Sequence, residues 1–314
     1  MDSPRYSAFT ITSTPYKIVN GQEIPVNIFL PRDITAGKLP ILVHFHGGFL
    51  FTGDSLFPDW TAQWSLDHVL SNSAIRVSAN YRLLPESTGL DVLSDIKDLY
   101  TWIETSSPSY LRSIGSRVEP DFEKIMVYGE SAGGYLALQS AILRPDLVKA
   151  VIAAYPMTYI DDAWYSVAST TKSPFGSPQL PRSILDSHIA SMEAGKIVSG
   201  AFPPARLALA LSALQSGSLT GLIGTDDTLY PARIISKMSG AEKMPFLFIF
   251  SGKQDSAVPW EHTERFAKLW ESKFGKENVY ARFETGDHGF DGEVSVETPW
   301  MREGLESVTR RWIS

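Results

Sequence analysis

The sequence places a serine between two glycines, at the point where a predicted strand meets a predicted helix. Residues 129–133 read Gly-Glu-Ser-Ala-Gly, after the apolar run 124–128 and before the small-residue segment 132–143. A serine on such a sharp turn presents its hydroxyl for nucleophilic attack. The chain contains no cysteine, so a thiol nucleophile is excluded and Ser131 is the candidate. A glycine-rich turn with an incidental serine is the alternative interpretation.

A second glycine-rich turn follows another predicted strand, further upstream. Residues 46–49, His-Gly-Gly-Phe, come directly after the apolar run 41–45. Acyl transfer generates a tetrahedral oxyanion, which is stabilised by N–H groups that already point at it. Consecutive glycines expose such amides, so this turn is a candidate source of two donors, and the N–H of Ala132 is a candidate third. A plain turn at the end of a strand is the alternative.

Alternating strand and helix patterns surround these two turns. Residues 16–19 and 24–30 flank Asn20-Gly21 and predict a β-hairpin, because this pair adopts the left-handed conformations of a tight turn. Further apolar patterns predict strands at 41–45, 75–80, 124–128, 148–155, 246–251 and 279–284, and helices at 90–105, 132–143, 260–274 and 300–313. This alternation predicts an α/β fold with a mostly parallel central sheet flanked by helices.

Three motifs, in order along the chain, resemble those of the hormone-sensitive-lipase-like esterases of the α/β-hydrolase superfamily. That family carries His-Gly-Gly-Gly, then Tyr-Arg-Leu-Ala-Pro-Glu, then Gly-Asp-Ser-Ala-Gly-Gly. This chain has His-Gly-Gly-Phe at 46–49, Tyr-Arg-Leu-Leu-Pro-Glu at 81–86 and Gly-Glu-Ser-Ala-Gly-Gly at 129–134. The resemblance covers about residues 16–314 and implies an α/β-hydrolase fold with a serine nucleophile.

The chain departs from the family at two positions. Phe49 stands in place of the third glycine, and Glu130 stands in place of the aspartate before the serine. The resemblance implies that the amides of Gly48 and Phe49 form the oxyanion hole, with Gly47 as the alternative. Phe49 keeps its N–H, but its side chain narrows the pocket or restricts the backbone.

The alternation of strands and helices is interrupted between residues 157 and 244. This range has scattered helical patterns and several prolines (Pro174, Pro178, Pro181, Pro203 and Pro204). Irregular loops of this length are uncommon in compact domains. We therefore expect a helical cap at 157–244, inserted into a hydrolase core of residues 1–156 and 245–314. Residues 1–15 are a further candidate for the cap.

Chain order indicates which residue acts as the base. In this fold the acid and then the histidine follow the serine. The histidines of the chain are His44, His46, His68, His188, His262 and His288. The first three precede the serine, the fourth lies in the predicted cap and the fifth lies in an amphipathic helix. His288 follows the last predicted strand, where the family places its base, and a surface histidine is the alternative.

Asp255 is the candidate acid that orients His288. It follows the predicted strand 246–251 and precedes Val258-Pro259, as the resemblance implies for this role. The rivals are Asp226, Asp227, Asp287 and Asp291. The first two lie in a turn of the predicted cap, and the third is adjacent to the histidine, a poor geometry for a bond to Nδ1. An Asx-turn is the alternative for Asp255.

Composition limits the classes of partner. The chain has 28 Lys and Arg against 35 Asp and Glu, so a nucleic-acid partner is not expected. No apolar stretch approaches the roughly 20 residues of a membrane span, and the amino terminus lacks a signal-peptide pattern, so we expect a cytoplasmic protein. His44 and His46 have no third ligand for a metal, and phosphate-binding motifs are absent, so no metal or other cofactor is expected.

The leading hypothesis is a serine hydrolase that cleaves a small or medium carboxylic ester through an acyl-enzyme, with Ser131, Asp255 and His288 as the catalytic triad. An acyltransferase, cyclase or condensation enzyme of a biosynthetic pathway is the alternative, and a ligand-binding receptor is less favoured. The expected partner is a small-molecule ester, and no pattern indicates an oligomeric state. Candidate pocket aromatics are Trp60, Trp64, Tyr159, Trp164, Tyr165, Phe175 and Phe202.

Overall fold

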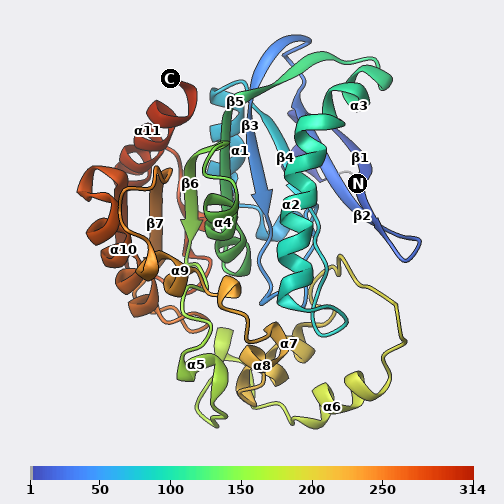
Figure 1. The fold of residues 1–314 in the computed structure, drawn as a ribbon, viewed down its shortest axis with the longest axis vertical. Coiled ribbons are helices and arrows are strands. Elements are labelled where there is room, and N and C mark those ends of the chain that lie inside the picture. The colour runs from blue at the N-terminus through green and yellow to red at the C-terminus, as the bar shows by residue number, and fades with distance from the viewer. Residues whose placement is uncertain (1–2) are drawn as a thin grey trace.

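One eight-stranded sheet organises the chain (Figure 1). The computed structural model describes residues 3–314, and the strand order is β1-β2-β4-β3-β5-β6-β7-β8. Strands β1 (Phe9–Val19) and β2 (Gln22–Pro31) form the expected antiparallel hairpin, and the turn residues Asn20 and Gly21 have φ values of 52° and 78°. Strand β2 also pairs antiparallel with β4 (Ile75–Ala79), and every later pair is parallel. The predicted α/β fold with a mostly parallel sheet is confirmed.

The central parallel strands are largely apolar, and helices cover both faces of the sheet. The parallel strands are β4 together with β3 (Ala36–Phe45), β5 (Arg117–Glu130), β6 (Val148–Ala154), β7 (Phe246–Gly252) and β8 (Val279–Glu284). All seven residues of β7 are buried, as are the last six of β5. Strand β5 begins well before the expected residue 124, because its first residues pair with the start of β3.

Two hydrophobic cores lie on the two faces of the sheet. Because successive side chains of a strand point to opposite faces, Val43 and Val127 belong to one core while their neighbours Leu42 and Met126 belong to the other. The first core is covered by α2 (Gly89–Thr105), α4 (Ala132–Leu143) and α10 (Trp260–Phe274), and the second by α1 (Gln63–Ser71) and α11 (Pro299–Ile313). The short helix α3 (Ser107–Ser113) follows α2.

The predicted cap, residues 157–244, contributes no strand to the sheet. It holds α5 (Ala163–Ser166), α6 (Ser183–Ala190), α7 (Leu207–Gln215), α8 (Leu219–Ile223) and α9 (Pro231–Lys237). Figure 1 shows α5 to α8 beyond the carboxyl ends of the parallel strands. Helix α9 instead packs against α10 and α4, beside the sheet. The division into core and cap stays a prediction.

The amino-terminal range 1–15, a further candidate for the cap, divides between two parts of the structure. Residues 9–15 belong to the edge strand β1, and the turn η1 (Pro4–Tyr6) precedes it. Residues 1 and 2 lie outside the described part of the chain. The other short 3₁₀ turns are η2 (Pro58–Trp60), η3 (Pro174–Gly176), η4 (Asp227–Leu229), η5 (Lys276–Asn278) and η6 (Phe290–Glu293).

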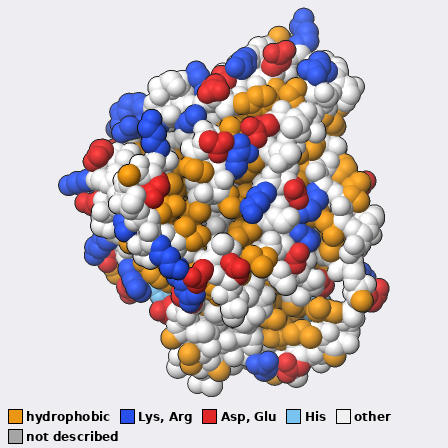
Figure 2. Space-filling view, viewed as in Figure 1, with side chains coloured by type: hydrophobic (Ala, Val, Ile, Leu, Met, Phe, Trp, Pro, Cys, Tyr) orange, Lys and Arg blue, Asp and Glu red, His pale blue; other side chains and the backbone are white. Residues whose placement is uncertain are grey.

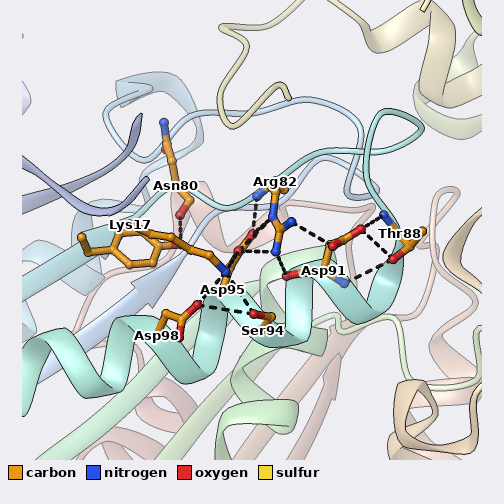
Figure 3. Close-up of polar contacts among 9 residues, drawn as sticks. Lys17, Asn80, Arg82, Thr88, Asp91, Ser94, Asp95 and Asp98 are labelled. Atoms are coloured by element: carbon orange, nitrogen blue, oxygen red, sulfur yellow. Dashed lines mark hydrogen bonds and ion pairs between the residues drawn. The ribbon is translucent and has the colours of Figure 1, made fainter. Parts of the chain in front are cut away.

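An ion-pair network fixes the segment 81–86 against the sheet edge (Figure 3). The carboxylate of Asp95, fully buried on α2, accepts a hydrogen bond from Lys17 of β1 at 2.8 Å and from Nε of Arg82 at 3.0 Å. Arg82 also pairs with Asp91 at 2.8 Å. Paired and hydrogen-bonded charges of this kind can be buried. The network therefore ties the hairpin, α2 and the segment 81–86 into one unit.

The surface carries charges of both signs. Figure 2 shows basic and acidic side chains interspersed across the face that it presents. Within residues 3–314, no helix has the length and apolar character that crossing a membrane requires. The same residues contain no group of three or more His, Asp or Glu side chains arranged to hold a metal ion.

Candidate active site

Ser131 lies on a strained turn between strand β5 and helix α4. Its backbone has φ 58° and ψ −118°, a conformation that residues other than glycine rarely adopt. The surrounding backbone holds it there, because its N–H donates to the carbonyl of Ala154 at 2.9 Å and its carbonyl accepts from the N–H of Tyr135 at 3.2 Å. The residue is 4% exposed. The turn thus holds the hydroxyl-bearing residue in one fixed conformation.

The glycines on either side of Ser131 are required by close backbone contacts. A Cβ on Gly129 would lie 2.1 Å from the carbonyl oxygen of Gly133, and a Cβ on Gly133 would lie 2.0 Å from the carbonyl oxygen of Phe45. Backbone atoms cannot move aside as a flexible side chain can. The two glycines of the Gly-x-Ser-x-Gly pattern are therefore required because the backbones of β5, α4 and the end of β3 approach one another closely at this turn.

The structure brings Asp255 and His288 together. Nδ1 of His288 lies 2.8 Å from Oδ2 and 3.0 Å from Oδ1 of Asp255. The Asp255 side chain is fully buried, and that of His288 is 8% exposed. Oδ1 of Asp255 also accepts hydrogen bonds from the N–H groups of Ala257 and Val258, at 2.9 and 2.8 Å. The Asx-turn and the bond to the histidine are thus both present, and the turn fixes the carboxylate that holds the imidazole.

The four rival carboxylates have other partners. Asp226 caps η4 by accepting from the N–H of Thr228 at 2.9 Å, and Asp227 pairs with Arg233 at 3.0 Å. Asp287 accepts from the N–H of Ser256 at 2.7 Å and so joins the two loops that carry Asp255 and His288.

Asp291, the last rival, is 1% exposed and lines the same cavity as His288. Its carboxylate accepts from the indole N–H of Trp64 at 3.0 Å and from the hydroxyl of Tyr155 at 2.9 Å. The ring of Tyr155 lies 4.4 Å from the ring of His288, centre to centre. Burial raises the pKa of Asp291, and the two hydrogen bonds oppose that rise. Tyr155 was not among the residues predicted from the sequence, and its one signal is its place just past the carboxyl end of β6.

Ser131 and His288 line one cavity of about 460 Å³. Of the six histidines, His288 alone contributes to its wall. Within residues 3–314 the Ser131 hydroxyl and Nε2 of His288 form no hydrogen bond to each other. The bond between nucleophile and base is often long in a ligand-free site and tightens when substrate binds.

Aromatic and acidic side chains complete the cavity wall. Of the expected aromatics, Trp60 and Phe175 line it, and Phe49 and Tyr155 join them. The other expected aromatics do not: Trp64, Tyr159, Trp164, Tyr165 and Phe202. Four carboxyl groups and one guanidinium also contribute: Asp59, Glu130, Asp291, Glu293 and Arg5. A wall of this kind suits a partly aromatic or neutral ligand better than a strongly anionic one.

The turn of residues 47–53, called the glycine turn below, faces the same cavity. Gly48 has φ 110°, and a Cβ there would lie 2.1 Å from the carbonyl oxygen of Thr52. Phe49 and Leu50 follow with φ values of 57° and 67°. Among the described residues, the N–H groups of Gly48 and Phe49 have no acceptor, and that of Ala132 begins α4, where no intrahelical acceptor exists. These N–H groups are therefore available to a bound ligand.

The N–H of Gly47 is already engaged, because it donates to Oε1 of Glu130 at 3.1 Å. Oε2 of the same carboxyl lies 3.0 Å from Nε2 of His44. Burial raises the pKa of Glu130 to about 7, and burial also lowers the pKa of His44 well below its ordinary value. Glu130, which stands where the resembled family has aspartate, thus connects the serine turn to the glycine turn. No sequence pattern predicted this contact.

Comparison with known proteins gives consistent matches. Residues 42–196 match a family model described as alpha/beta hydrolase fold. The chain is 28% identical to probable carboxylesterase M8 of a Phoma species over 324 residues, which covers 99% of this chain and 100% of that protein. It is 30% identical to probable carboxylesterase clz11 of Cochliobolus lunatus over 204 residues, which covers 63% of this chain and 92% of that protein. The solved structure of carboxyl esterase 2 from the mycorrhizal fungus Tuber melanosporum has a TM-score of 0.63 at 16% identity, covering 98% of this chain and 88% of that one.

Proposed function

The chain belongs to the α/β-hydrolase family, and from this premise we propose that it hydrolyses a small or medium carboxylic ester with Ser131 as nucleophile. The expected resemblance to esterases of this family is thereby confirmed. The observation that carries the proposal is the Asp255–His288 pair, 2.8 Å apart, whose histidine shares a cavity with the strained serine.

Acylation begins when the Ser131 hydroxyl attacks the ester carbonyl and Nε2 of His288 takes its proton. Asp255 holds Nδ1–H, which fixes the tautomer and stabilises the imidazolium. The oxyanion forms beside the N–H groups of Gly48, Phe49 and Ala132, which have no competing acceptor within residues 3–314. Gly47 is left out of the hole because Glu130 holds its N–H. His288 then gives its proton to the leaving alcohol.

Deacylation repeats these roles with water. His288 removes a proton from a water molecule that attacks the acyl-enzyme, and the tetrahedral oxyanion occupies the same donors. Collapse of the intermediate releases the acid, and His288 returns the proton to Ser131. Each proton is carried by His288, so the sequence of steps needs no cofactor.

The test is hydrolysis of 4-nitrophenyl acetate, butyrate and octanoate by the wild type, Ser131→Ala and a control, Ser307→Ala. Ser307 lies on α11 with its hydroxyl bonded to the carbonyl of Glu303, away from the cavity. We expect Ser131→Ala to lose at least about 10³-fold in kcat and to lose labelling by a fluorophosphonate, while Ser307→Ala keeps both. Equal rates for the wild type and Ser131→Ala would overturn the proposal.

Product analysis separates hydrolysis from acyl transfer. With an added alcohol or amine, we expect the free acid as the main product. A transferred or cyclised product in its place would contradict hydrolysis while leaving the nucleophile assignment intact.

A further inference from the structure

Arg206, in the predicted cap, reaches into the core with its whole guanidinium. Nε donates to the carbonyl of Phe51 at 2.8 Å, and Nη2 donates to the carbonyl of Leu84 at 2.6 Å. Nη1 and Nη2 also lie 3.0 and 2.7 Å from the two carboxylate oxygens of Glu86. A guanidinium can serve three acceptors at once because its donors are fixed in one plane. The contacts connect the residue preceding α7 to two core segments.

One of those segments is the glycine turn, and the other is the segment 81–86. The two are joined directly, since the N–H of Leu84 donates to the carbonyl of Leu50 at 2.8 Å. Arg206 then holds the next carbonyl of the turn, that of Phe51. The turn is therefore fixed by two consecutive carbonyls, and one of them depends on a side chain from outside the core.

The glycine turn needs such support because of its backbone conformation. Phe49 and Leu50 both have left-handed φ values, which persist in residues other than glycine only where the surroundings determine them strongly. The cap segment just before Arg206 supplies further contacts. Thr52 donates its hydroxyl to the carbonyl of Ala205 at 2.6 Å, and Gly53 forms a two-bond bridge with Ala201 at 2.9 and 2.8 Å.

The charges at this cross-link are matched and mostly buried. The Glu86 side chain is 7% exposed, and that of Arg206 is 15% exposed. Burial alone would raise the pKa of Glu86, but its hydrogen bonds with Arg206 leave that pKa below the ordinary value. The Glu86 carboxylate therefore stays ionised at neutral pH, and charge-assisted bonds are the stronger and more directional kind. His188 of α6 adds a contact to the same carboxylate at 2.8 Å.

We propose that Arg206 is a positioning residue for the oxyanion hole: its guanidinium holds the glycine turn in the conformation that aims the N–H groups of Gly48 and Phe49 into the cavity. This inference rests on the proposed ester hydrolysis. Arg206 touches neither substrate nor Ser131 and acts through the carbonyl of Phe51. Docking of the segment 201–206 and formation of the hole are then one event.

The test compares Arg206→Lys with the wild type and with Arg233→Lys. Lysine keeps the charge opposite Glu86 but cannot serve the three acceptors with one planar group. Arg233 is the matched control, since it also lies in the predicted cap and pairs with carboxylates, of Asp161 and Asp227, outside the cavity. We expect Arg206→Lys to lower kcat about 10- to 100-fold with KM changed less than about 3-fold, because misplaced donors cost transition-state stabilisation. Arg233→Lys should keep both constants.

A second readout separates positioning from a general loss of structure. A trifluoromethyl ketone adds to the serine and forms a tetrahedral oxyanion, so its affinity should fall in proportion to kcat/KM in Arg206→Lys. The affinity of a product acid, which forms no oxyanion, should stay within about 3-fold. Glu86→Gln retains the bond from Arg206 to Phe51, and we expect it to lose less of kcat than Arg206→Lys.

Two outcomes would overturn the inference: Arg206→Lys with the kcat of the wild type, or a loss of product-acid affinity as large as the loss of ketone affinity. A wild type that hydrolyses no ester is a separate result, because it defeats the proposed function before any Arg206 variant is made.

Discussion

Nδ1 of His288 lies 2.8 Å from Oδ2 of Asp255, although the two residues follow different strands. Those strands, β7 and β8, are parallel neighbours at the edge of the sheet. Because the carboxyl ends of parallel neighbours lie side by side, the two loops are adjacent in space although Asp255 and His288 are 33 positions apart in sequence. Asp287 strengthens the arrangement by accepting from Ser256 across the same gap.

Replacing Asp255 by asparagine should remove catalysis and leave the fold. Asparagine can still accept from the N–H groups of Ala257 and Val258, but it no longer selects the Nδ1–H tautomer or stabilises the imidazolium. We expect kcat to fall about 10³- to 10⁴-fold in Asp255→Asn, measured with 4-nitrophenyl butyrate. Asp226→Asn, at a rival acid that caps η4, is the control and should keep full activity. Comparable losses in both variants would remove Asp255 from the triad.

Glu130 should make stability depend on pH. Burial raises its pKa from 4.5 to about 7, so the protonated form is favoured in the folded state. Glu130 contributes its full stabilisation of the folded state below pH 4.5, where it is protonated in both the folded and the unfolded state. This stabilisation is lost as the pH rises through about 7, because Glu130 of the unfolded chain is already ionised at that pH. The full effect of this rise corresponds to about 3 kcal/mol.

Glu130→Gln tests this linkage because glutamine cannot ionise. Urea unfolding of both proteins at pH 5 and pH 8 gives the difference in their free energies of unfolding at each pH. We expect the free energy of unfolding of Glu130→Gln, relative to that of the wild type, to be about 2–3 kcal/mol higher at pH 8 than at pH 5. A difference that does not change with pH would show that Glu130 ionises as an exposed glutamate does.

Gly133→Ala should disrupt the serine turn, because its Cβ would lie 2.0 Å from a backbone carbonyl oxygen of Phe45. We expect a loss of about 4 kcal/mol or more in stability, or failure to fold. Gly221→Ala is a matched control: Gly221 is exposed on α8, and a Cβ there has no atom within 4 Å. It should stabilise the protein by about 0.5–1 kcal/mol. Thermal unfolding of the two variants measures both effects, and equal behaviour would refute the close-contact explanation.

Phe49→Gly should lower the stability of the protein and enlarge the cavity. The buried ring would be lost, at about 3–5 kcal/mol, and relief of the left-handed backbone would return about 1 kcal/mol. Because Phe49 lines the cavity, we expect the preference in kcat/KM to shift toward esters with bulkier acyl groups. An unchanged preference across acetate, pivalate and benzoate esters would show that Phe49 does not limit the pocket.

Many of the strands and helices could be predicted from the sequence, but the contacts between them could not. The helices 132–143 and 260–274 and the strand 279–284 appear with the expected bounds, and the two helices do so because their apolar residues are buried in the core. Strand β5 extends back to Arg117, since residues with little apolar character there gain partners only when β3 lies alongside. The serine candidate followed from the Gly-x-Ser-x-Gly turn, the acid candidate from the resemblance and the base candidate from chain order and position. The bonds of Glu130 to Gly47 and of Tyr155 to Asp291 join residues 83 and 136 positions apart, and no local pattern encodes them.

The order of the sheet has a consequence for the protein during its synthesis. From β3 outward the parallel strands β5, β6, β7 and β8 add to one edge in the order in which they are translated. The serine turn is complete only after β6 has joined β5, because the carbonyl of Ala154 holds the N–H of Ser131, and the loops that carry Asp255 and His288 follow the last two strands. With the roles proposed for Ser131 and His288, a chain still on the ribosome would hold the nucleophile before the base, and we expect hydrolytic activity to begin only when the final strand has joined the sheet.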